Sequence, residues 1–148
     1  MLLLIDTSKV NSTVALGNKQ GEIIDIRKNI TKLKLSQTLL SMINLLLKRN
    51  KLSLKDLKGI IVVQGPGSFT GLRVGISVAN SLGYGLETPV VGVKKCKVQS
   101  AKCKIKSPKL KISYNSILEK GLKKLRYAKL GKIVRPFYGE EPHVMVKE

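Results

Sequence analysis

The spacing of apolar residues predicts a sheet at the start of the chain. Short apolar runs at Leu2–Asp6 and Ser12–Gly17, and an alternation of apolar and polar positions over Glu22–Lys28, are typical of strands. The segments between them are short and polar, which predicts two consecutive hairpins and therefore an antiparallel meander.

The pattern then changes to helices that alternate with buried strands. A helix is expected over residues 36–49 with Ser36 as its N-cap, and Ser53 to Asp56 matches a capping box. Two continuous apolar strands are expected at Gly59–Gln64 and Pro89–Val93, with a second helix between them at Gly71–Tyr84. This order predicts an α/β fold, a mixed sheet in which parallel strands extend the antiparallel meander and helices pack on it.

The last third of the chain is organised differently. Residues 94–112 hold eight lysines, both cysteines and little periodicity, which predicts a basic linker after a first domain of residues 1–93. A second capping-box match, from Ser116 to Glu119, predicts a helix that runs to about Leu130 and stops at Gly131. Residues 113–148 are therefore expected to form a C-terminal helix and an extended tail.

The net charge of +19 is concentrated in one part of the chain. Residues 94–135 carry fifteen basic side chains and a single acidic one, Glu119. Such a density attracts phosphate backbones, so RNA contact is one hypothesis, and a lysine-rich solvated surface is the other. The candidate nucleic-acid contacts are Lys102, Lys104, Lys106, Lys123, Lys124 and Arg126.

Composition and cysteine spacing exclude several classes of protein. Hydrophobic residues make up 43% of the chain, which is globular, and apolar runs such as Met1–Ile5 are far too short to span a bilayer. That run carries no features of a secretory signal, so a cytoplasmic protein without membrane contact is expected. Cys96 and Cys103 are separated by six residues and His143 is the only histidine, so no metal site is predicted.

A glycine-rich segment, QGPGSFTGLRVG at Gln64–Gly75, follows a buried strand and opens a helix. Backbone N–H groups at such a position bind anions, which makes Gly65, Gly67 and Ser68 candidate phosphate contacts. The segment does not match a P-loop, which ends in Gly-Lys-Ser/Thr, and its glycines are spaced one residue too widely for the dinucleotide fingerprint.

Together with LLLIDTS at the start and PVVGV after the second helix, this segment closely resembles the TsaB family, also called YeaZ. The resemblance covers residues 1–93 nearly end to end, and ILEKGLKKLRYAKLGKIVRPFYG resembles the family's C-terminal helix and ending. It implies a single actin/Hsp70-like (ribonuclease H-like) lobe and a role in the threonylcarbamoyladenosine modification of tRNA. In that pathway the family acts as a non-catalytic scaffold and activator that docks on the TsaD transferase, together with TsaE.

The chain also departs from the family. Fifty-five residues follow Val93, which implies a shortened form without most of the second lobe. A nucleotide clamp in this fold needs loops from both lobes, so no cofactor is expected and ATP is expected only with a partner. Asp6, Thr7 and Ser8 are the candidate residues of a first phosphate loop. A nucleotide-binding enzyme is the alternative function, although neither two histidines at helical spacing nor a catalytic triad is present.

The two central helices carry a pattern of their own, because the second has a small residue at every fourth position. Glycine inside a helix costs about 1 kcal/mol relative to alanine, so such a stripe indicates a close approach of another backbone. The predicted interface residues are Leu39, Met42, Ile43, Leu46, Gly71, Gly75, Ala79 and Gly83. A leucine at Gly75 is expected to block association with TsaD and leave the lobe folded. Packing of the two helices on each other, and a homodimer through the same face, are the alternatives.

Overall fold

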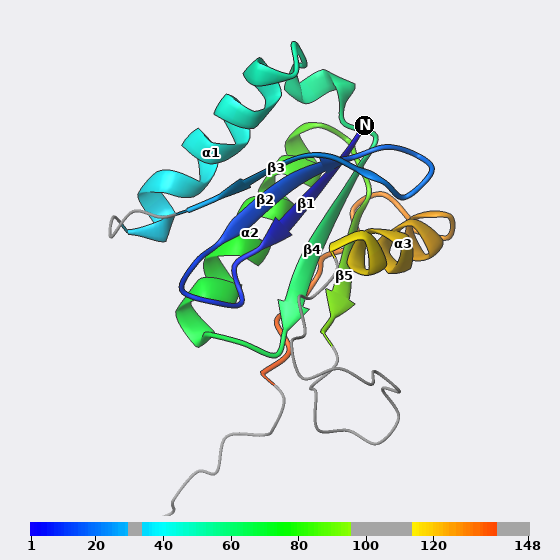
Figure 1. Ribbon diagram of the computed structural model, residues 1–148. Helices are drawn as coiled ribbons and strands as arrows, with labels where there is room; N and C mark the ends of the chain where they lie inside the picture. Colours follow the sequence, from blue (N-terminus) through cyan, green and yellow to red (C-terminus); the bar gives the residue numbers. More distant parts are fainter. Residues whose placement is uncertain (30–33, 96–113, 139–148) are drawn as a thin grey trace, which may run out of the picture.

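The computed structural model describes residues 1–29, 34–95 and 114–138. Five strands form one sheet in the order β3-β2-β1-β4-β5 (Figure 1). The strands are β1 (Leu2–Asp6), β2 (Thr13–Gly17), β3 (Ile23–Lys28), β4 (Gly59–Gly65) and β5 (Val90–Lys94). The first three pair as an antiparallel meander, whereas β4 and β5 run parallel to β1. The predicted α/β class with its mixed sheet is therefore confirmed.

Helices cover both faces of this sheet. The helices are α1 (Leu35–Arg49), α2 (Phe69–Gly85) and α3 (Tyr114–Leu125), and a short 3-10 turn, η1, spans Leu54–Asp56. In Figure 1 α1 and α2 lie on one side of the sheet and α3 lies on the other. None of the helices in the described ranges is long and apolar enough to cross a membrane.

The boundaries of the helices differ from the prediction at their starts. Helix α1 begins at Leu35 with Lys34 as N-cap and no side-chain cap bond, so Ser36 is not the cap. Helix α2 begins two residues before Gly71, because the Ser68 hydroxyl caps it by accepting a hydrogen bond from Gly71 N at 3.3 Å. The predicted capping box at Ser53 is present: its backbone N–H donates to Asp56 Oδ2 at 2.7 Å.

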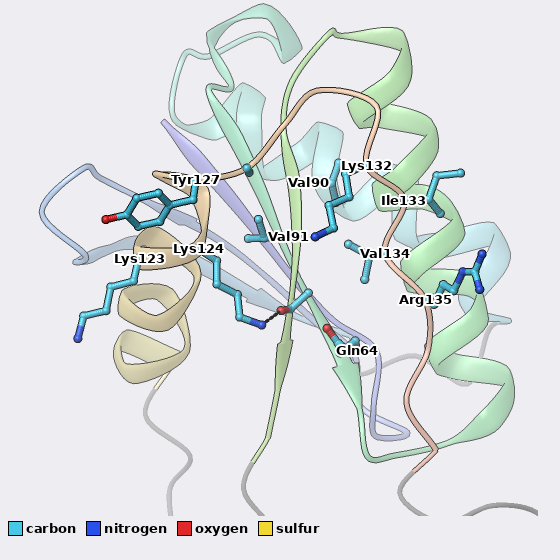
Figure 2. Close-up of a pocket in the computed structure, with 12 residues that line it drawn as sticks. Gln64, Val90, Val91, Lys123, Lys124, Tyr127, Lys132, Ile133, Val134 and Arg135 are labelled. Atoms are coloured by element: carbon cyan, nitrogen blue, oxygen red, sulfur yellow. Dashed lines mark hydrogen bonds between the residues drawn. The ribbon is translucent and has the colours of Figure 1, made fainter.

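Helix α3 is followed by a segment that crosses to the other side of the sheet. The helix starts at Tyr114 and ends at Leu125, so Ser116 lies inside it and the predicted end at Leu130 is too late. Residues 131–138, which we call the C-terminal strap, run past the edge of β5 toward α2 (Figure 2). Asn80 of α2 holds the strap, because it donates to Val134 O at 2.9 Å and accepts from Val134 N at 3.1 Å.

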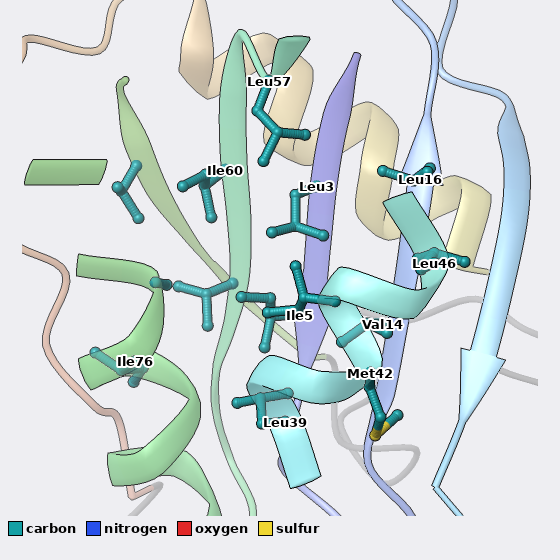
Figure 3. Packing of buried hydrophobic residues seen from close by; sticks show 14 of the residues in the cluster. Leu3, Ile5, Val14, Leu16, Leu39, Met42, Leu46, Leu57, Ile60 and Ile76 are labelled. Atoms are coloured by element: carbon teal, nitrogen blue, oxygen red, sulfur yellow. The ribbon is translucent and has the colours of Figure 1, made fainter. Parts of the chain in front are cut away.

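The core has two layers, one on each face of the sheet, because successive side chains of a strand point to opposite faces. Leu3 and Ile5 of β1 point toward α1 and α2 (Figure 3), whereas Leu2 and Leu4 point toward α3. The first layer is closed by Leu39, Met42, Leu46 and Ile76 of the two helices, and the second by Ile117 and Leu118 of α3.

Candidate functional site

The candidate site lies where β1 ends, and Asp6 is at its centre. The Asp6 side chain is only 3% exposed. Its Oδ1 accepts hydrogen bonds from Ser8 N at 3.1 Å and from the Ser8 hydroxyl at 2.6 Å, which closes the turn after the strand. The predicted segment Asp6, Thr7 and Ser8 is thus brought together, with all three residues buried.

Two residues from distant parts of the chain complete this cluster, and the sequence prediction missed both. Lys95, directly after β5, places its Nζ 2.5 Å from Asp6 Oδ2 and 2.8 Å from Ser8 Oγ. Tyr114, the first residue of α3, donates its hydroxyl to Asp6 Oδ2 at 3.0 Å, and that hydroxyl also lies 3.2 Å from Thr13 Oγ1. Both carboxylate oxygens of Asp6 are therefore engaged within the chain.

The electrostatics of the cluster follow from these contacts. Burial on its own would raise the pKa of Asp6, but the hydrogen bond from Lys95, those from Ser8 and the charge of Lys95 together hold this pKa below its usual value. Burial raises the pKa of Tyr114 to about 12, and the neighbouring Asp6 carboxylate contributes to the rise. The cluster is therefore a carboxylate paired with an ammonium group beside a neutral phenol.

The glycine-rich loop packs directly against the end of β1. Ser68 N donates to Ser8 O at 2.9 Å, and a Cβ placed on Gly67 would lie 2.4 Å from the same oxygen. Gly65, at a φ of +132°, leaves room for the Phe137 carbonyl of the C-terminal strap, and Phe137 N donates to Gln64 O at 2.6 Å. The two predicted phosphate loops therefore lie together, and they are in direct contact with each other.

These contacts do not fit a metal–nucleotide complex. A divalent cation at Asp6 would have to displace the Lys95 ammonium group, and a phosphate between the loops would have to break the bond between Ser68 and Ser8. The described part of the chain also holds no group of three or more His, Cys, Asp or Glu side chains that could bind a metal ion. The role of the cluster is therefore structural: the Lys95 ammonium group neutralises the buried Asp6 carboxylate.

The predicted interface residues are not on an open surface, and this part of the prediction is wrong. All eight are buried: the four of α1 and Ala79 lie in the core, Gly71 and Gly75 face Thr7 directly after β1, and Gly83 faces Val90 of β5. A Cβ on Gly71 would lie 2.3 Å from Thr7 O, and one on Gly83 would lie 2.1 Å from Val90 Cγ2. The close approach that the small residues allow is made by the chain's own sheet, so a leucine at Gly75 would disturb the fold.

The open surface between the helices is formed mainly by other residues. A groove of about 340 Å³ lies between α1, η1 and α2, with the Leu40 side chain 54% exposed beside it. Leu40, Ser41, Ile43, Asn44, Leu54 and Leu82 line it. Of the predicted interface residues only Ile43 borders this groove, as part of its floor.

The predicted nucleic-acid residues divide into two groups. Lys102, Lys104 and Lys106 lie outside the described residues. Lys123, Lys124 and Arg126 are exposed on or directly after α3. Lys124 donates to Gly92 O of β5 at 2.6 Å.

Comparison with known proteins places this fold in a family. Residues 26–114 match the family model for TsaD, tRNA N6-adenosine threonylcarbamoyltransferase. The tRNA threonylcarbamoyladenosine biosynthesis protein TsaB of Buchnera aphidicola subsp. Schizaphis graminum is 35% identical over 98 residues, which are 66% of this chain and 46% of that protein. TsaB of Escherichia coli K12 is 35% identical over 92 residues, 62% of this chain and 39% of that protein.

The solved structures agree with the sequence comparison. YeaZ from Pseudomonas aeruginosa is similar with a TM-score of 0.56 and 33% identity, over 63% of this chain and 42% of that one. The chain spans less than half the length of these relatives. Since the family model matches more than half of the chain, the chain belongs to the family that the TsaD model describes, and its TsaB and YeaZ relatives, which it matches over part of their length, make it a TsaB (YeaZ) member of that family.

Proposed function

We propose that the chain is a non-catalytic partner in tRNA threonylcarbamoyladenosine biosynthesis and docks on a TsaD-type transferase through the groove between α1 and α2. The names of its relatives support the pathway. The single observation that carries the docking is the groove itself, which leaves apolar side chains of two packed helices open to a partner. Exposed apolar patches of this kind mark interfaces.

The composition of the groove favours a helix of the partner. Its walls are apolar at Leu40, Leu54 and Leu82, and its polar side chains are the small Ser41 and Asn44. An amphipathic helix places an apolar stripe into a groove of this kind, with small polar groups at the rim.

A catalytic role has less support. An enzyme of this fold would use the loops at Asp6 and Gly67 to hold a nucleotide, and both are filled by contacts within the chain. The paired Lys95 and the Tyr114 phenol offer neither a free base nor a free acid near neutral pH, because one is engaged in an ion pair and the pKa of the other is about 12.

Replacing Leu40 with glutamate should weaken the complex with a TsaD-type transferase. A charge at this position would have to be desolvated under the partner helix, so the dissociation constant should rise at least about tenfold. Isothermal titration with the purified transferase measures the change. The variant should fold normally, because the Leu40 side chain is half exposed.

Val10→Glu is the matched control for this experiment. Val10 is 96% exposed in the turn between β1 and β2, and the substitution makes the same change of charge away from the groove. Its dissociation constant should equal that of the unchanged chain. Equal binding by Leu40→Glu and Val10→Glu would refute docking through the groove, and light scattering shows whether a second copy of the chain fills the groove instead.

A further inference from the structure

A second pocket, of about 650 Å³, opens at the β5 edge of the sheet, where α3 and the C-terminal strap lie on either side of β5 (Figure 2). Its walls include Val90 and Val91 of β5, Ala128, and Ile133 and Val134 of the strap. Most of its surface is apolar, and Ile133 is 69% exposed. The pocket lies mainly in residues 123–135, beyond the segment that the family model matches.

Cations surround this apolar pocket. Lys123, Lys124, Lys132 and Arg135 all line it, and Figure 2 shows Lys124 and Lys132 extending toward the edge of β5 from opposite sides. The ion pairs found within the described ranges join Arg49 to Asp25 and Lys95 to Asp6, so none of these four cations is neutralised by a carboxylate there. An anionic partner is the complement of such a rim.

We propose that this pocket binds a single-stranded segment of RNA, with phosphates on the cationic rim and an unstacked base against the apolar walls. Unpaired bases are recognised in this way, in pockets beside cations that track the backbone. The bases of a duplex are stacked inside it and cannot enter a pocket enclosed by a helix and a strap. The four cations of the rim indicate that the ligand is a polyanion. That this polyanion is RNA rests on the proposed function in a tRNA pathway.

An acidic peptide added as a strand to β5 is the competing occupant, and the contacts at the edge oppose it. A peptide strand needs the outward carbonyls of the edge strand. Lys124 Nζ already donates a hydrogen bond to the outward carbonyl of Gly92, in the middle of β5. Phosphates need only the charges of the rim and leave that bond in place.

The test measures the fluorescence anisotropy of a labelled oligoadenylate with the full chain across a salt series. For single strands, each phosphate neutralised contributes about 0.7 to the slope of log K against log salt concentration. Lys132→Gln combined with Arg135→Gln should therefore reduce the magnitude of the slope by about 1.4. Lys51→Gln combined with Lys55→Gln, at exposed sites that do not line the pocket, is the control with the same net charge and should leave the slope unchanged.

A second variant tests the pocket without changing its charge. Ala128→Trp fills the space against the walls, and should weaken oligoadenylate binding about tenfold while the melting temperature stays close to that of the unchanged chain. A duplex RNA of equal length should bind more weakly than the single strand.

Three results would overturn the inference: an unchanged slope in Lys132→Gln with Arg135→Gln, unchanged binding in Ala128→Trp, or tighter binding of oligoglutamate than of oligoadenylate. Its failure is separable from that of the docking proposal. Leu40→Glu should bind the oligonucleotide normally, and the strap variants should bind the transferase normally.

Discussion

Replacing Lys95 with methionine should lower the free energy of unfolding by about 3–5 kcal/mol, because it leaves the Asp6 carboxylate charged and buried without its partner. The Lys95 side chain is 7% exposed and that of Asp6 is 3% exposed, so water cannot substitute for the ammonium group. Urea unfolding near neutral pH measures the loss. Lys58→Met, at an exposed lysine, should change the stability by less than about 0.5 kcal/mol.

The same variant should lose less stability than the unchanged chain as the pH falls. In the unchanged chain the pKa of Asp6 is depressed, so its contribution is complete above the unfolded pKa and is lost as the pH falls through the folded pKa. Without Lys95, the pKa of Asp6 is higher than in the unchanged chain, because burial still raises it and only the Ser8 hydrogen bonds still lower it; protonation then relieves the unpaired charge. The stability gap between the two proteins should therefore narrow as the pH falls from about 7 toward about 4.

A double variant identifies the cause of the loss. Asp6→Asn removes the charge and retains a side chain that can bond to Ser8 and Tyr114, so Lys95→Met combined with Asp6→Asn should recover most of the stability. If the double variant is as unstable as Lys95→Met, the loss comes from the packing of the lysine stem, and the ion pair is not its source.

Replacing Gly71 with alanine should destabilise the fold by about 1–3 kcal/mol, although alanine is the better helix former. The added Cβ would lie 2.3 Å from Thr7 O, a backbone atom that cannot move aside without shifting the end of β1. Gly85, at the end of the same helix, has no heavy atom within 4 Å of such a Cβ. Gly85→Ala should therefore stabilise the chain by about 0.5 kcal/mol.

Thermal unfolding of the two alanine variants compares them directly, since both make the same chemical change in one helix. We expect melting temperatures that move in opposite directions. A Gly71→Ala protein as stable as the Gly85→Ala protein would show that β1 yields to the new methyl group, and would contradict the close packing of α2 on the loop after β1.

The strands of the sheet could be predicted because a strand that is buried on both faces must consist mostly of apolar residues. Strands β4 and β5 are covered on both faces, and only continuous apolar runs such as Ile60–Val63 satisfy that requirement. Helix starts were harder to predict, because several residues can cap a helix. Ser36 had the right chemistry but lies one residue inside α1, whereas Ser68 caps α2 from within a loop that the glycine pattern assigned to phosphate binding.

The candidate site was only half predictable. Asp6 and Ser8 are neighbours in sequence and form a recognisable turn, but Lys95 is 89 residues and Tyr114 is 108 residues from Asp6. The one signal for Lys95 was its place directly after a strand parallel to β1, since the carboxyl ends of parallel strands share one edge of the sheet. The small residues of α2 correctly indicated a close approach, but local sequence cannot tell whether the approaching atoms come from the same chain.

The placement of α3 on the sheet has a consequence for the chain as it is synthesised. The face formed by Leu2, Leu4, Ile61 and Val63 is covered by Ile117 and Leu118, which emerge from the ribosome after the five strands of the described sheet. A nascent chain that has emerged only through Lys95 would present this apolar face to water, and would be a substrate for chaperones until its last helix arrives.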